Sequence, residues 1–134
     1  MMNDRYLFRG KRVDNGEWVQ GFFINDSLKG GFNFLITTGG NHIGGLYNGH
    51  RIDPATLGQC TGLKDKCGKL IFEGDILRID DKYSIDGKTP NLVVRYSEKD
   101  AGFYAYNEHG SPRSICYSDC YAEIVGNIYD NLKL

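Results

Sequence analysis

Glu73 and Asp75 have the spacing most suggestive of catalysis, since a single glycine separates the two carboxylates. A carboxylate pair can serve acid–base catalysis when its surroundings drive the two pKa values apart across a cleft. Beside a glycine turn, Asp75 is better placed to accept the backbone N–H bonds that hold a corner. We therefore interpret this pair as structural.

Two histidines in polar, glycine-containing segments offer another candidate. His42 and His50, with Tyr47 and Arg51, form a candidate loop site, and an enzymatic alternative would use the two histidines with Asp53. Exposed loop histidines are common. The sequence has no serine nucleophile elbow and no recoverable Cys–His pair. We expect no catalytic residues and classify the chain as a non-enzyme.

Cofactor binding also lacks support in the sequence. Gly87-Lys88-Thr89 resembles the end of a phosphate-binding loop, but Lys82 stands where that motif needs a glycine. Pro90 follows directly, where the motif needs a helix with free backbone donors. The glycine-rich stretch 39–45 does not match a dinucleotide fingerprint in its spacing. We expect no cofactor.

The four cysteines allow two interpretations. Cys116 and Cys120 have three residues between them and could share a zinc ion, whereas Cys60 and Cys67 are six residues apart and need a wider loop. We prefer four unconnected thiols and no metal. No apolar run has the length of a signal peptide or a membrane span. We therefore expect a cytoplasmic protein with reduced thiols and no membrane association.

A group of aromatic and basic residues near the N-terminus is the candidate nucleic-acid or partner face: Tyr6, Phe8, Arg9, Lys11 and Trp18. Small β-proteins bind single strands through such mixtures, because bases stack on rings while Lys and Arg neutralise phosphates. The chain has 16 Lys+Arg and 17 Asp+Glu, a formal net charge of −1. That balance disfavours a nucleic-acid coating protein, and a solvated strand face is the plainer interpretation.

The elements that must position these residues are mostly short strands. The 134 residues fit one domain, and 18 glycines beside 9 Tyr and 7 Phe favour strands and tight turns. Residues 6–13 and 17–24 flank Asp14-Asn15-Gly16, a strong hairpin signal, and residues 32–38 form another strand. Asp53 and Pro54 have the types that cap and begin a short helix, which Gly58 ends.

The C-terminal half has denser strand signals. Residues 59–63 and 69–72 form a hairpin, and the corner at Glu73 leads into a strand over 76–80. Further strands are expected at 92–97, 103–107 and 123–129, with Ser118 capping a helical turn. The sequence predicts a mainly β, antiparallel fold. Region 1–58 is an N-terminal hairpin and meander, and region 59–134 is a small bent barrel, the two packed as one unit.

Three stretches, in this order and covering nearly the whole chain, resemble the YopX family. They are Phe8-Arg9-Gly10-Lys11 with Trp18-Val19-Gln20-Gly21, residues 54–76, and Val125-Gly126-Asn127-Ile128-Tyr129-Asp130-Asn131. The family usually has an aromatic residue in place of Cys60 and Asn in place of Cys67, which weakens a shared role for these thiols. The Gly-Asp pair before an apolar strand also resembles the turn of SH3-like barrels.

The resemblance implies a phage or prophage protein in the cytoplasm of a bacterial host. It implies no established activity, so no functional residue is transferred. We predict a non-enzymatic binding or self-assembling module whose partner is a second copy or another phage or host protein. The alternative is weak binding of single-stranded nucleic acid by the N-terminal hairpin.

Overall fold

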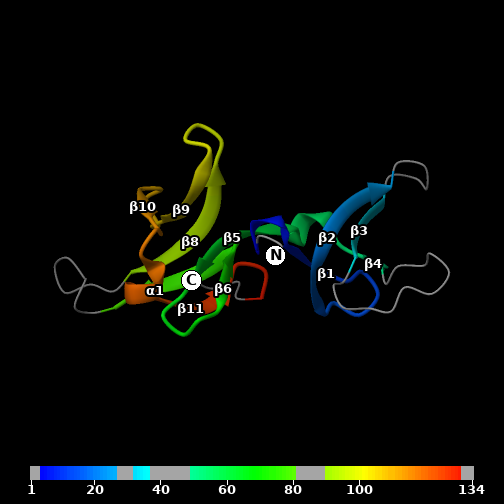
Figure 1. Cartoon of the computed structure of the whole chain (residues 1–134), viewed down its shortest axis with the longest axis horizontal. Helices are drawn as coiled ribbons and strands as arrows, with labels where there is room; N and C mark the ends of the chain where they lie inside the picture. The colour runs from blue at the N-terminus through cyan, green and yellow to red at the C-terminus, as the bar shows by residue number, and fades with distance from the viewer. Residues whose placement is uncertain (1–3, 27–31, 37–48, 81–89, 131–134) are drawn as a thin grey trace. The chain divides into compact units, whose positions relative to one another are not determined.

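The computed structural model describes residues 4–26, 32–36, 49–80 and 90–130. The chain divides into two compact units, Met1–Cys60 and Thr61–Leu134. Its described elements are mostly strands in two antiparallel sheets (Figure 1), so the predicted mainly β fold is confirmed. Within the described ranges, every helix is too short to reach across a membrane. The prediction that the two regions form one packed unit stays a prediction.

The first unit begins with the expected hairpin. After a 3-10 turn, η1 (Asp4–Tyr6), strand β1 (Phe8–Lys11) pairs antiparallel with β2 (Trp18–Asp26). Gly16 has φ +72°, a conformation that glycine adopts without steric cost, and its N–H donates to Arg12 O at 2.9 Å. The asparagine–glycine turn therefore folds as its sequence predicts.

Three further elements complete the first unit. β3 (Phe32–Ile36) pairs with β2, and β4 (Gly49–Arg51) pairs with β3. An isolated antiparallel bridge between Arg12 and Ile52 then returns the chain to the end of β1. The 3-10 turn η3 (Pro54–Thr56) follows, and the Asp53 carboxylate accepts from Ala55 N at 3.0 Å. The predicted cap and helix start are confirmed.

Gly10 marks the buried side of the β1–β2 hairpin. A Cβ at this position would lie 2.8 Å from Ile52 Cδ1, which is too close for any larger residue without a shift. Ile52 is 1% exposed. The hairpin face that contains Gly10 is therefore the inner one, and the alternate residues of both strands face outward.

β5 (Gly58–Lys64) crosses the unit boundary: its first residues pair with β1, and Thr61 Oγ1 donates to Ile71 O in β6 (Leu70–Phe72). The second unit then forms a sheet in the order β10-β9-β8-β7-β11. Its members are β7 (Asp75–Ile79), β8 (Asn91–Ser97), β9 (Gly102–Tyr106), β10 (Pro112–Ser114), α1 (Ser118–Tyr121) and β11 (Ala122–Asn127).

Two details of the second unit differ from expectation. β10 lies between the strand expected at 103–107 and the helical turn expected at Ser118, where the sequence predicts no strand. Ser118 does not cap α1, which has Tyr117 at its N-cap; the Ser118 hydroxyl donates to Lys64 O at 2.9 Å instead. Among the described strands, no pairing joins the edge strands β10 and β11, so no closed barrel is found and the SH3-like detail stays a prediction.

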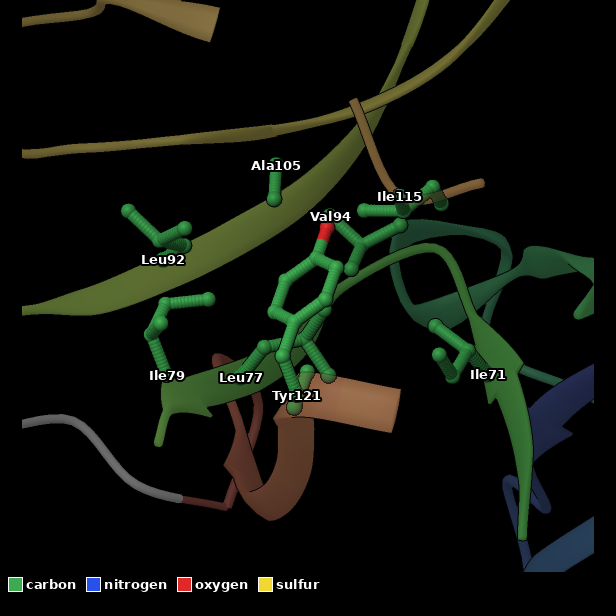
Figure 2. Packing of buried hydrophobic residues seen from close by; sticks show 9 residues of the cluster. Ile71, Leu77, Ile79, Leu92, Val94, Ala105, Ile115 and Tyr121 are labelled. Atoms are coloured by element: carbon green, nitrogen blue, oxygen red, sulfur yellow. The ribbon is translucent and has the colours of Figure 1, made fainter. Parts of the chain in front are cut away.

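The hydrophobic core of the second unit lies on one face of its sheet. Figure 2 shows Leu77 of β7 and Val94 of β8, each 0% exposed, around the ring of Tyr121. The other members of the cluster are Ile71, Ile79, Leu92, Ala105, Ile115 and Ala122. Burial raises the pKa of the Tyr121 hydroxyl, which donates to Ser114 O. Apolar burial is therefore the main force holding this unit.

Candidate binding interface

The outer face of the β1–β2 hairpin brings together three of the predicted site residues. Arg9 and Lys11 are two positions apart in β1, so their side chains point to the same side of the strand. Lys11 lies opposite Trp18 in the ladder. The guanidinium carbon of Arg9 is 4.8 Å from the centroid of the Trp18 ring, and Lys11 Nζ is 5.4 Å from it. Two cations on one indole form a pair of cation–π contacts at the surface. We call this group the cationic patch.

The other two residues predicted for this face, Phe8 and Tyr6, do not lie beside Arg9 and Lys11 in the strand alternation. Phe8 precedes Arg9, so strand alternation turns it to the opposite side, where its ring is 5.8 Å from that of Phe23. Tyr6 is part of η1 and is 58% exposed. The expectation of one shared face is therefore wrong for Phe8, and for Tyr6 it stays a prediction.

Arg12, at the end of the hairpin, is occupied within its own turn. Its Nε donates to Asp14 Oδ1 at 2.9 Å and its Nη2 to Asp14 Oδ2 at 2.6 Å. The hydrogen bond from Arg12 is the largest of the effects that lower the pKa of the Asp14 carboxyl. Because Arg12 forms this bidentate pair with Asp14, we do not include it in the cationic patch.

An apolar row extends the same outer face along β2. Phe22 comes four residues after Trp18 and Ile24 two residues after Phe22, so all three side chains point to one side of the strand. Phe22 is half-buried, and Ile24 is 43% exposed. We call Phe22 and Ile24 the apolar row. The alternation of side chains along β2 already predicts this row from the sequence. That Ile24 is exposed is seen only in the structure.

The candidate loop site is only partly described. His42 and Tyr47 lie outside the described residues. His50 and Arg51 are consecutive in β4, opposite Leu35 and Phe34, so their side chains project from opposite faces of the strand. The Asp53 carboxylate caps η3. Among the described residues these groups do not converge, and the site stays a prediction.

Asp75 at the predicted corner has a structural role. Asp75 is 2% exposed, and its Oδ2 accepts from Phe72 N at 2.8 Å. Gly74 has φ +89°. The interpretation of Asp75 as the acceptor that holds this corner is confirmed.

The described cysteines are not disulfide-bonded: Cys60 is buried, and Cys67 and Cys116 are exposed. In the part of the chain that the structure describes, no three His, Cys, Asp or Glu side chains group as metal donors.

The family model described as YopX protein matches residues 7–134. The chain belongs to the YopX family. Its fold is similar to that in a crystal structure of protein EF1440 from Enterococcus faecalis, at 24% sequence identity over 94% of each chain, with a TM-score of 0.55. No curated protein sequence matches it. The family assigned from the three sequence stretches is confirmed, and the structural likeness extends over both units.

Proposed function

We propose that this YopX-family chain is a non-enzymatic binding module that self-associates through the apolar row of its hairpin. The exposed fraction of Ile24, 43%, on the same face as Phe22 and Trp18, is the observation that carries the proposal. Gln20 separates Trp18 from Phe22 on this face, so the neighbouring apolar side chains are Phe22 and Ile24, and apolar side chains gathered on a sheet surface are typical of a contact site. The family resemblance supports a phage or prophage origin and action in the cytoplasm of a bacterial host.

The charges on the hairpin support one arrangement of the two copies. Arg9 and Lys11 lie beside Trp18, at the start of β2, whereas Ile24 lies near its end. A two-fold axis near Ile24 joins the two apolar rows and keeps the four cations at the periphery. An axis at Trp18 would place like charges face to face, which is unfavourable. The proposed dimer therefore centres on the apolar row.

Sedimentation velocity at micromolar concentrations tests self-association. We expect the wild-type chain to dimerise and the Ile24→Asp variant to be monomeric, because a buried charge at the axis has no partner. Val13→Asp is the matched control, since Val13 is also an aliphatic side chain of the first unit and is 52% exposed. A monomeric wild-type protein, or equal effects of both variants, overturns the proposal.

A second candidate function is weak binding of single-stranded nucleic acid at the cationic patch, favoured by the two cations over Trp18. Fluorescence anisotropy of a labelled oligothymidine should show binding that weakens with salt. Arg9→Ala or Lys11→Ala should each lower the salt slope by about 1. Arg12→Ala is the matched control, since Asp14 already holds this guanidinium. Unchanged anisotropy at low salt excludes this candidate.

A further inference from the structure

The outer face of the second sheet carries an aromatic and basic group outside the sites discussed above. In the β8–β9 ladder, Arg95 lies opposite Tyr104, and Val93 lies opposite Tyr106. The intervening residues Val94 and Ala105 are 0% and 1% exposed in the core. Because side chains alternate along a strand, both tyrosines and Arg95 project from the side away from the core.

The edge strand β10 extends this face without adding charge. Ser114 lies opposite Tyr104, and Pro112 lies opposite Tyr106. Both β10 residues are exposed, as is Arg95, and both tyrosines are half-buried. The result is two adjacent rows across the three strands, each with a tyrosine at its centre. We call Arg95, Tyr104 and Tyr106 the tyrosine platform.

Local packing supports the two rings from below. A Cβ at Gly102 would lie 3.6 Å from Tyr104 Cε2, so this ring leans along β9 over a residue without a side chain. Val93, opposite Tyr106, is 7% exposed. The Tyr104 ring is therefore held near the sheet, and less side-chain entropy is lost when a planar ligand stacks on it.

We propose that the tyrosine platform binds single-stranded nucleic acid, with bases stacked on Tyr104 and Tyr106 and a phosphate bound by Arg95. Two positions along a strand separate the rings by about 6.7 Å, so each can take a different base. Sheets that bind single-stranded RNA use aromatic residues in this way. Stacking tolerates any sequence because every base has a π face.

Charge complementarity selects a nucleic acid over an apolar partner. Arg95 is exposed, and its row across β8, β9 and β10 continues with Tyr104 and Ser114, with no carboxylate. On the same face Glu123 of β11 lies opposite Arg78 of β7, so these two charges offset each other. Arg95 thus supplies an exposed cation beside the rings, while the Asp100 carboxylate, just beyond the end of β8, accepts from Ser97 Oγ at 3.1 Å. The platform uses a different unit from the hairpin and does not rest on the proposed function.

The test measures binding of a fluorescein-labelled oligouridine of 12 nucleotides, and of its oligothymidine counterpart, to the full chain at low salt. Tyr104→Leu and Tyr106→Leu remove the π face and keep apolar bulk, and each should weaken binding about tenfold. Arg95→Gln should lower the salt slope by about 1. Tyr117→Leu is the matched control, because Tyr117 is 74% exposed and lies outside the sheet.

Selective weakening by the platform variants, with Trp18→Leu and Tyr117→Leu unchanged, supports the platform. Weakening by Trp18→Leu alone assigns binding to the hairpin and overturns the platform. Equal competition by duplex DNA, an effect of Arg95→Gln alone, or no binding also overturns it. If a tyrosine variant does not fold, photocrosslinking of 5-bromouridine oligomers to the wild-type chain decides, and crosslinks outside residues 95–106 contradict the proposal.

Discussion

The two units place their apolar side chains differently. In the second unit nine buried residues form one cluster, with Leu77, Val94 and Ala122 at 0% exposure. Among the described side chains of the first unit, Ile52 and Cys60 are the buried apolar ones, while Tyr6, Val13 and Ile24 are more than 40% exposed. The second unit therefore folds around one buried cluster, whereas the described part of the first unit buries few apolar side chains.

Side-chain hydrogen bonds at turns help to hold the described part of the first unit. Asn15 Oδ1 accepts from Glu17 N at 2.9 Å and shapes the hairpin turn. Thr56 Oγ1 accepts from Lys11 N at 2.9 Å and donates to Asp53 O at 2.7 Å, which ties η3 to β1. Each such bond contributes only about 1 kcal/mol, so no single one dominates this unit.

The largest expected effect is that of Leu77→Ala. Leu77 is 0% exposed at the centre of the core, and its truncation should cost about 3 kcal/mol of unfolding free energy. Ile24→Ala in the first unit, which removes a 43% exposed side chain, should cost less than about 0.5 kcal/mol. Urea unfolding followed by circular dichroism measures both. Similar losses in the two variants would erase the contrast between the units.

The same experiment asks whether the units unfold together. Trp18 is the single tryptophan of the chain and reports on the first unit. In the Leu77→Ala variant, coincident shifts of the Trp18 fluorescence and circular-dichroism midpoints show one cooperative unit. A fluorescence midpoint that stays at the wild-type value shows that the first unit unfolds by itself, and this would contradict the sequence-based expectation of one packed unit.

Asp65→Asn tests a polar anchor of the second unit. Asp65 is 2% exposed; its Oδ1 accepts from Cys67 N and Lys69 N at 2.9 Å each, and its Oδ2 accepts from Ile124 N at 3.0 Å. An asparagine cannot accept at both positions. We expect a loss of about 2 kcal/mol of unfolding free energy at pH 7, because one buried N–H then faces a donor.

The pH dependence of this loss has a defined sign. Burial raises the pKa of the Asp65 carboxyl, but the backbone N–H bonds from Ile124, Lys69 and Cys67 outweigh it, and the pKa lies below its usual value. The anchor therefore stabilises the fold above the unfolded-state pKa of about 3.9 and loses this effect as pH falls through the folded-state pKa. The difference between wild type and Asp65→Asn should shrink below pH 4, whereas a difference constant down to pH 3 would contradict this.

Gly74→Ala and Gly16→Ala form a matched pair across the two units. Both glycines have positive φ, +89° and +72°, so each alanine meets backbone strain of about 1 kcal/mol. Around Gly16 there is open space, whereas a Cβ at Gly74 would lie 2.8 Å from Tyr129 Cε2 and displace that ring. We expect Gly74→Ala to lower the free energy of unfolding by about 2 kcal/mol and Gly16→Ala to lower it by about 1 kcal/mol, both measured by urea unfolding. Equal losses would show that Tyr129 moves without cost.

The sequence predicted local features better than long-range ones. The Asp14-Asn15-Gly16 turn and the Asp53 cap depend on neighbouring residues, and both are confirmed. Strand β10 was missed because its three residues are polar or proline and carry no periodicity. The role of Asp65 depends on Ile124, which is 59 positions away, so no local pattern shows it.

In the candidate site, too, local features could be predicted from the sequence better than long-range contacts. Alternation along β1 groups Arg9 with Lys11 and separates both from Phe8, so the sequence itself held the signal that corrects the predicted face. The contact of both cations with Trp18 depends on the register of the hairpin, which the turn sets. The tyrosine platform needs the register of three strands at once, and only the structure supplies it.

A small effect is expected of Asp53→Ala, which removes the side-chain cap of η3 in the first unit. The loss of the bond from Ala55 N should cost about 1 kcal/mol, and Asp53→Asn, which keeps an acceptor oxygen, should cost less than half of that. The Trp18 fluorescence midpoint in urea measures both variants. Since Thr56 still binds Asp53 O and Lys11 N, η3 should remain attached to β1. A loss as large as that of Leu77→Ala would mean that the first unit depends on this cap as the second depends on its core.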